Sequence, residues 1–198
     1  MVGNFVKACL GILLRRSAVL AVMSIVYFGS VFVAVLWAQV QVPPPYVGVP
    51  VELPEFLSGL DWPLMIIGIF FFNLVWSSFI IVTLPGLVFF PLSAGVLVYR
   101  GFLWGLLLRQ MPTSLFLVVL PTVVLEGESY VLASVTGTIL GMSWLKPDWV
   151  FKKEGLPRLE SFKKALGECL WLYVFVAVVL FVAAVVETFT ILSLTVLF

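Results

Sequence analysis

The sequence contains no histidine, and its only cysteines are Cys9 and Cys169. Histidine is the most frequent general base and metal ligand, so its absence excludes the commonest forms of both chemistries. The two cysteines lie far apart in the sequence and form neither a CxxC pair nor a zinc-binding spacing. We therefore expect two free thiols, no metal site and no cofactor.

Charged residues are also scarce, since they make up 11% of the chain and leave a formal net charge of +1. A soluble domain carries about 25% charged residues, so this composition excludes an ordinary soluble protein. The near-neutral balance provides no long-range attraction for nucleic acid. No phosphate-binding P-loop sequence is present, so any link to nucleotide hydrolysis requires a separate ATPase partner.

The alternating pattern of half-buried strands is missing, and the apolar runs are continuous. Hydrophobic residues make up 63% of the chain, and the mean hydropathy is +1.22. Backbone polar groups must be satisfied within a bilayer, so such runs indicate spanning helices rather than a barrel. The predicted fold class is all-α. We expect a polytopic membrane helix bundle in a single transmembrane domain, residues 1–198, with about five spans plus a broken or re-entrant helix.

The distribution of charge predicts the topology. Residues 1–16 are mildly amphipathic and indicate an interfacial lead-in. The apolar run 17–38 is longer than a signal-peptide core, which favours a retained anchor over a cleaved signal. The proline-rich loop 40–61 carries acids but no Lys or Arg, whereas the loop 146–167 is basic. By the positive-inside rule, the N-terminus and loop 146–167 are cytoplasmic, loop 40–61 lies outside, and the protein is a multi-pass protein of the cell membrane.

Two of the middle spans carry polar side chains. The span 62–82 contains Asn73 and Ser77, one turn apart on one face. Such groups in lipid usually turn toward a neighbouring helix, either as structural hydrogen bonds or as contacts to a ligand. The span 92–108 contains Arg100 near its middle, and an intramembrane arginine needs a partner or must extend to the interface.

The segment 120–133 places acids and helix-breaking residues inside an apolar run. Glu126 and Glu128 flank Gly127, and Pro121 precedes them. We interpret the run 113–145 as a broken or re-entrant helix with its break at Glu126-Gly127-Glu128, because irregular backbone at membrane depth must line a cavity or lie within protein. The last span, 168–186, is followed by Glu187, which lies at membrane depth if the helix continues into the apolar tail.

Small residues recur every fourth position in two spans, and this spacing permits close helix approach. The residues expected to form these packing faces are Gly101, Gly105, Ala133, Gly137 and Gly141. Such faces favour a homo-oligomer, with a dimer as the first expectation. The other expected partners are the lipid bilayer and membrane or cell-envelope proteins, and no nucleic acid is expected.

Four short motifs occur in order between residues 69 and 190. They are Phe72-Asn73-Leu74, Ser93-Ala94-Gly95, the run from Leu120-Pro121-Thr122 to Glu126, and the run from Ala184 to Phe189 that contains Glu187. In content, order and spacing they resemble the motifs of the stage II sporulation protein M family of bacterial and archaeal membrane proteins. The histidine and glycine of that family's proline signature are absent here.

The resemblance implies a helical integral membrane protein in which Glu126 and Glu187 occupy the family's acidic positions. Glu128 is then an additional acid. For spore-forming bacteria the resemblance also implies a role in engulfment, within complexes that degrade peptidoglycan and that depend on partner proteins. Because the signature histidine is missing, no histidine chemistry is expected.

The candidate polar site within the membrane comprises Glu126, Glu128, Glu187, Arg100 and Asn73. We hypothesise that Glu126 and Glu187 converge in the bundle and that Arg100 pairs with one of them. Two interpretations are open: a charge-paired core that fixes helix register, and a site for an ion, a proton or a polar solute.

Two functions follow from these interpretations. The first is a non-enzymatic membrane scaffold or complex component, and the alternative is a small ion- or proton-linked channel or transporter. An intramembrane hydrolase is disfavoured, because the chain has no histidine and no adjacent pair of glutamates within a span. The protein is therefore not expected to be an enzyme.

Overall fold

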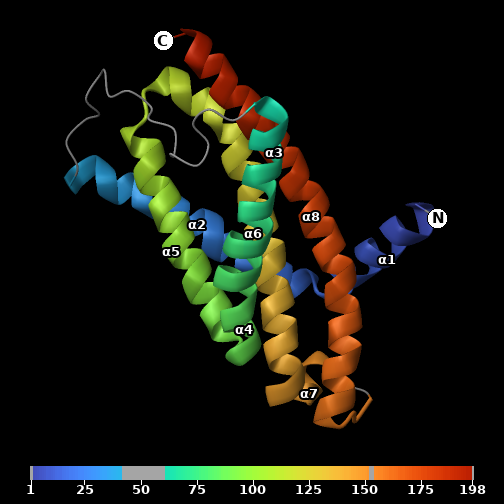
Figure 1. Ribbon diagram of the computed structural model, residues 1–198. Helices are drawn as coiled ribbons and strands as arrows, with labels where there is room; N and C mark the ends of the chain where they lie inside the picture. Colours follow the sequence, from blue (N-terminus) through green and yellow to red (C-terminus); the bar gives the residue numbers. More distant parts are fainter. Residues whose placement is uncertain (1, 42–60, 152–153, 198) are drawn as a thin grey trace.

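All of the described secondary structure is helical. The computed structural model describes residues 2–41, 61–151 and 154–197. Within those ranges the elements are, in chain order, α1 (Val2–Arg15), α2 (Ser17–Gln41), α3 (Trp62–Phe71), η1 (Phe72–Thr83), α4 (Leu84–Val88), α5 (Pro91–Gln110), α6 (Thr113–Leu145), α7 (Pro147–Val150) and α8 (Arg158–Leu197) (Figure 1). The predicted all-α fold is confirmed for these residues.

Five stretches among the described residues are long and apolar enough to cross a membrane. They are Ser17–Gln41, Trp62–Val88, Pro91–Gln110, Leu115–Leu145 and Arg158–Ser193. The second stretch consists of α3, η1 and α4, which follow one another without a gap. The expected polytopic bundle is therefore confirmed, and α7 lies at the end of the bundle opposite the C-terminus (Figure 1).

Two predicted loops differ from the structure or lie outside it. Residues 42–60 of the predicted loop 40–61 lie outside the described residues. The predicted basic loop 146–167 is largely helical, because it contains α7 and the beginning of α8 at Arg158. At its other end α8 runs on to Leu197, so Glu187 lies within a continuous helix.

The predicted break at Glu126-Gly127-Glu128 is wrong. α6 is one continuous helix of 33 residues that passes through both Pro121 and Gly127. Gly127 instead provides space for a neighbouring helix, because a Cβ atom at this position would overlap the ring of Tyr27 on α2. A glycine in an apolar span therefore marks a close contact here rather than a turn.

The irregular backbone is found in the adjacent span. η1 is a π-helix, in which the hydrogen bonds run between residues five apart, and such geometry is frequent at functional sites. Asn73 and Ser77 both lie on its buried face. The helix is thus distorted where its polar side chains enter the core.

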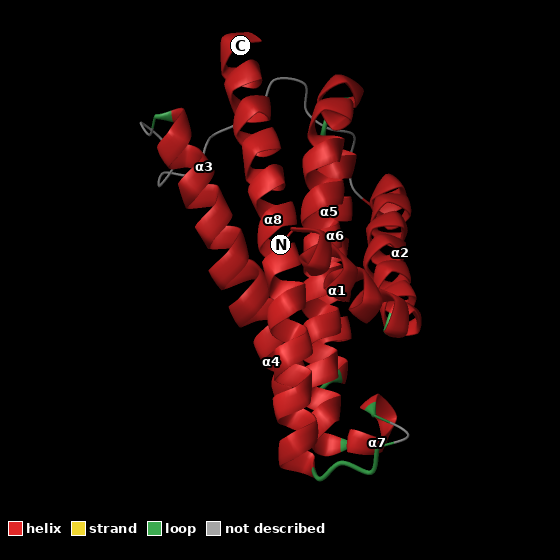
Figure 2. Ribbon diagram, turned by 90° about the vertical axis from the view of Figure 1, so that its right-hand side faces the viewer, coloured by secondary structure: helices red, strands yellow, loops and turns green. Residues whose placement is uncertain are grey.

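α6 is the central helix, packed against α2, η1, α4, α5 and α8. Figure 2 shows α6 near the middle, with α2 on one side and α3 on the other. The most extensive helix pairs are α6 with α8 and α2 with α5. Any side chain on the buried face of α6 can therefore meet groups from several spans.

The predicted small-residue faces pack within the chain. A Cβ at Gly101 would overlap Ser30 on α2, and one at Gly105 would overlap the backbone carbonyl of Val31. On α6, Ala133 is fully buried. A Cβ atom added at Gly137 or Gly141 would overlap the backbone between Thr83 and Phe90. These faces join helices of one chain, so the predicted homo-oligomer stays a prediction without support from them.

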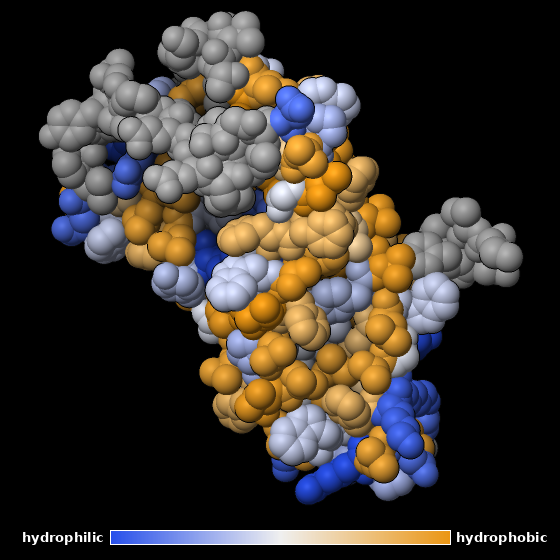
Figure 3. Space-filling model, in the orientation of Figure 1, coloured by the Kyte–Doolittle hydropathy of each residue, from blue (hydrophilic) through white to orange (hydrophobic). Residues whose placement is uncertain are grey.

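The outward faces of the spans are apolar. Large hydrophobic side chains exposed along α3 and η1 are Phe71, Phe72, Val75, Trp76 and Phe79. Figure 3 shows mostly hydrophobic side chains over the middle of the visible face, and hydrophilic ones near both ends, including the end that carries α7. Such a surface suits lipid contact, and the chain is a multi-pass membrane protein.

Candidate functional site

Three side chains form a hydrogen-bonded cluster at the centre of the bundle. Asn73 Nδ2 donates to Glu126 Oε1 at 2.7 Å. The Tyr130 hydroxyl lies 3.0 Å from Asn73 Oδ1 and 3.2 Å from Glu126 Oε2, facing both acceptors. Glu126 is 4% exposed and Tyr130 is fully buried. Because Glu126 and Tyr130 are four residues apart on α6, they lie one above the other on the same helix face.

Glu187 brings a second carboxyl group to this cluster from α8. It lies within hydrogen-bonding reach of the Glu126 carboxyl. Its Oε2 atom is buried and has no hydrogen-bond partner among the described residues. Two carboxyl groups hydrogen-bond to each other only when one of them carries a proton. The structure thus brings together the two acids expected to converge.

Arg100, on α5, reaches the cluster through an aromatic ring rather than an ion pair. Its guanidinium carbon lies 4.1 Å from the centre of the Tyr130 ring. No ion pair joins Arg100 to Glu126 or Glu187 in the described part of the chain, so the predicted pairing is corrected. The cation is stabilised by the face of the ring while its field still acts on Glu126.

Glu128 is not part of the cluster. It follows Glu126 by two residues on a regular helix, so its side chain points from a different face of α6. It is half-buried, and no hydrogen bond or ion pair of Glu128 occurs among the described residues. Of the predicted site residues, Glu128 alone is left apart from the others.

Tyr27 belongs to the cluster although the sequence did not indicate it. It lies on α2, is fully buried, and its ring fills the space beside Gly127. Its hydroxyl is buried without a hydrogen-bond partner among the described residues, in the electrostatic neighbourhood of Glu126 and Arg100. The available signal was weak: Tyr27 is the only tyrosine in the mainly apolar run from Ser17 to Ala38.

Comparison with known proteins identifies the family of this chain. A family model described as "Stage II sporulation protein M" matches residues 17–190, most of the chain. The chain belongs to the stage II sporulation protein M family. The matched region includes the whole cluster, from Tyr27 to Glu187. Comparison with curated proteins and with solved structures gave no match.

In this member of the stage II sporulation protein M family, the cluster holds two carboxyl groups and one guanidinium group. These charges come from α5, α6 and α8. Unbalanced charge is costly at membrane depth, so the neutral arrangement has one carboxylate, one protonated carboxyl and the arginine cation. The cluster is therefore suited to holding one exchangeable proton or small cation between Glu126 and Glu187.

Among the described residues, no group of three His, Cys, Asp or Glu side chains lies close enough together to hold a metal ion. Oxygen atoms of two carboxyls, an amide and two phenols are the groups present. The carboxyl and phenol groups can bind and release protons, and the oxygen atoms of all these groups can contact a small cation.

Proposed function

We propose that this membrane protein of the stage II sporulation protein M family is a small ion- or proton-linked transporter or channel. In this proposal Glu126 and Glu187 take up and release a proton or a small cation at the centre of the bundle. The observation that carries the proposal is the Glu187 carboxyl, which lies against Glu126 and has one buried oxygen without a hydrogen-bond partner in the described part of the chain.

An incompletely satisfied network favours this function over a purely structural core. Buried polar groups in proteins are nearly all hydrogen-bonded, and a structural network is useful only when each member is satisfied. Both Glu126 oxygens have hydrogen-bond partners, but Glu187 Oε2 and the Tyr27 hydroxyl have none among the described residues. Free acceptor positions beside a carboxyl pair are where a transported ion or a transferred proton would sit.

Flux through the purified protein tests the proposal. The full chain is reconstituted into liposomes containing a pH-sensitive dye, and proton entry is followed after a membrane potential is imposed. We expect Glu187→Gln to reduce the rate to the background of empty liposomes, because an amide neither binds nor releases a proton near neutral pH. Glu128→Gln is the matched control, since it removes an acid from the same region outside the cluster and should leave the rate unchanged.

Two outcomes of this experiment would contradict the transport proposal. A Glu187→Gln protein that elutes and unfolds like the unmodified chain but retains its flux would show that the pair is not the ion site. Absence of flux for protons, sodium, potassium and uncharged polar solutes in the unmodified protein would remove the transport proposal altogether.

A non-enzymatic scaffold is the second candidate, and the close helix contacts favour it. Gly101 and Gly105 bring α5 against the α2 backbone, and Gly141 brings α6 against the Gly86 carbonyl. Such contacts limit the sliding that an alternating-access carrier needs. If the protein is a scaffold, chemical crosslinking in native membranes should capture a second copy or an envelope partner while the liposomes show no flux. Neither candidate requires catalysis.

A further inference from the structure

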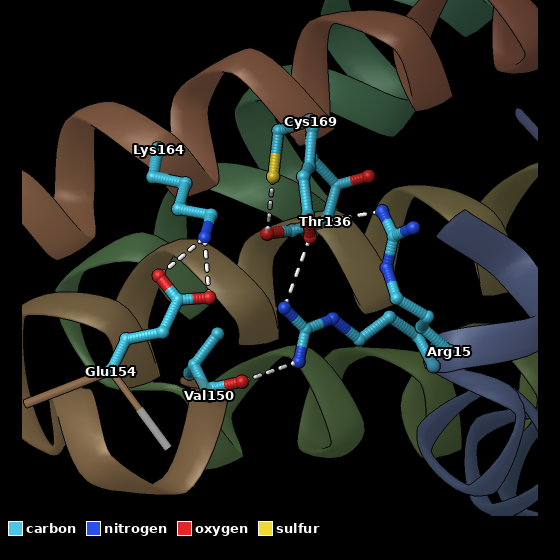
Figure 4. Close-up of polar contacts among 8 residues, drawn as sticks. Arg15, Thr136, Val150, Glu154, Lys164 and Cys169 are labelled. Atoms are coloured by element: carbon cyan, nitrogen blue, oxygen red, sulfur yellow. Dashed lines mark hydrogen bonds and ion pairs between the residues drawn. The ribbon is translucent and has the colours of Figure 1, made fainter. Parts of the chain in front are cut away.

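A groove of about 840 Å³ lies at the α7 end of the bundle, outside the carboxyl cluster. It is bounded by the end of α1, the start of α2, α7 and the first turns of α8. Figure 4 shows side chains from these elements meeting there. We call it the basic groove, and its charged lining residues are Arg15, Arg16, Lys164, Glu154 and Glu168.

One carboxylate in this groove serves two arginines. Arg15 Nη2 lies 3.1 Å from Glu168 Oε1, and Arg16 Nη2 lies 3.0 Å from Glu168 Oε2. Lys164 forms a separate ion pair with Glu154. The described lining therefore has three cations and two carboxylates, so it carries one net positive charge.

Arg16 makes two contacts in the groove and still has one unused N–H donor among the described residues. Its Nη1 donates to the Val150 carbonyl at 2.8 Å, which ties α7 to the start of α2. Its Nε atom is buried and has no acceptor among the described residues. A buried guanidinium N–H without a partner is costly, and an anionic oxygen would satisfy it.

Phe151 holds two of the cations close to the same place. The Arg16 guanidinium carbon lies 5.3 Å, and the Lys164 ammonium 4.8 Å, from the centre of its ring. Ring contacts of this kind hold cations near each other despite their mutual repulsion. The cations gathered around the basic groove produce a positive electrostatic potential, and a bound anion would neutralise it.

The surroundings are those of a membrane interface. Leu10 and Leu14 precede the arginines on α1 and are exposed, and Trp149 is 54% exposed at the rim. Exposed tryptophans gather at the level of lipid headgroups, and basic hollows between spanning helices receive anionic headgroups. A diffusing phosphate would use the charges of the groove but not this apolar rim.

We propose that the basic groove binds the phosphate group of an anionic phospholipid. Arg15 and Arg16 donate to the phosphate oxygens, and Lys164 supplies further positive charge. The acyl chains lie beside the exposed ring of Trp149 at the edge of the groove. The lipid would thereby hold α1 and α7 against α8.

Lipid binding to the purified full chain tests this proposal. The protein in a neutral detergent is titrated with phosphatidylglycerol, with phosphatidylcholine, with glycerol 3-phosphate and with inorganic phosphate, and bound lipid is counted by native mass spectrometry. We expect phosphatidylglycerol to bind at least tenfold more tightly than phosphatidylcholine. Removing one basic side chain should weaken that binding about fivefold, the effect of one charge near a lipid surface.

Substitutions at two exposed cations separate an effect on lipid binding from an effect on folding. Arg15→Gln and Lys164→Gln change side chains that are 60% and 43% exposed, so each protein should fold normally. Arg158→Gln is the matched control, because it removes an exposed cation from the start of α8 outside the basic groove. We expect weaker phosphatidylglycerol binding for the first two variants and none of this loss for the control.

Three results would overturn the proposal. One is equal affinity for phosphatidylglycerol and phosphatidylcholine. Another is an equal loss of binding in Arg158→Gln and Arg15→Gln, which would indicate a diffuse surface charge. The third is tight binding of inorganic phosphate or glycerol 3-phosphate that displaces the lipid, which would assign the groove to a free phosphate compound.

Discussion

The Asn73 side chain on η1 donates a 2.7 Å hydrogen bond to the Glu126 carboxyl on α6. This contact joins the distorted span to the central helix at the point where α8 brings Glu187 alongside. Asn73 therefore orients Glu126, and Glu126 in turn presents its carboxyl to Glu187. The predictions below separate the contribution of this network to folding from its contribution to ion movement.

Asn73→Leu should destabilise the protein strongly. The change removes both the donor to Glu126 and the acceptor for Tyr130, leaving buried polar groups without partners. We expect a loss of about 2–4 kcal/mol in the free energy of unfolding, measured by denaturation in mixed detergent micelles. Gln110→Leu, at an exposed position, should change stability far less. Equal losses for both variants would show that the hydrogen bonds contribute little.

The two buried tyrosines should respond differently to loss of their hydroxyl groups. Tyr130→Phe removes a donor used by Asn73 and Glu126, so we expect a loss of about 1–2 kcal/mol of stability. Tyr27→Phe removes a hydroxyl that has no partner, so stability should be unchanged or slightly increased. If the hydroxyl of Tyr27 contacts the ion, Tyr27→Phe should lower liposome flux despite normal stability. Normal flux in that variant would place Tyr27 outside the ion site.

Two glycine-to-alanine substitutions on α5 form a matched pair that tests the packing of α2 against α5. A Cβ at Gly105 would overlap the Val31 carbonyl and the Ala34 side chain, so Gly105→Ala should destabilise by about 1–3 kcal/mol. Gly95 has no neighbour within reach, and Gly95→Ala should be neutral or stabilising by up to about 1 kcal/mol, because alanine favours helix. Thermal unfolding of both variants measures the difference. The reverse order would contradict the helix contact.

The ion pairs at the α7 end should differ in importance. Glu168 joins two arginines and is largely buried, and its replacement by Gln leaves the partly buried Arg16 without its counter-ion. We expect Glu168→Gln to cost about 1–3 kcal/mol and to increase proteolysis near Arg15 and Arg16. The Glu154–Lys164 pair is exposed, so Glu154→Gln should cost about 0–1 kcal/mol. Similar stability for the two variants would contradict this ranking.

The cysteines should be protected from labelling in the folded protein. Cys9 is 3% exposed, and burial raises the pKa of its thiol above the usual value. A raised pKa means that less thiolate exists near neutral pH, so maleimide labelling of Cys9 should be slow and should speed up as the pH rises. Cys169 is also buried, and both thiols should react quickly after unfolding in sodium dodecyl sulfate. Fast labelling at pH 7 in the native protein would contradict the docking of α1.

Local composition was enough to predict the membrane class, the helical fold and the number of spans. A run of apolar residues of bilayer length has one stable solution, because its backbone must be satisfied internally wherever the rest of the chain lies. The same physics indicated the site. Glu126, Glu187, Arg100 and Asn73 are polar groups within apolar spans, and such groups turn inward toward one another.

Tertiary packing decided how those groups meet. The sequence around Gly127 is compatible with a hinge or with a close contact, and in the fold α6 continues through this glycine with the Tyr27 ring packed against it. Arg100 had two acids within reach in principle, but the crossing of α5 and α6 sets it over the Tyr130 ring. Composition along the chain is enough to identify the segments that lie within the membrane domain, since apolar runs of this length are stable there and not in water. Which atoms face each other depends on helix crossing and rotation, and those are fixed only when all the spans pack together.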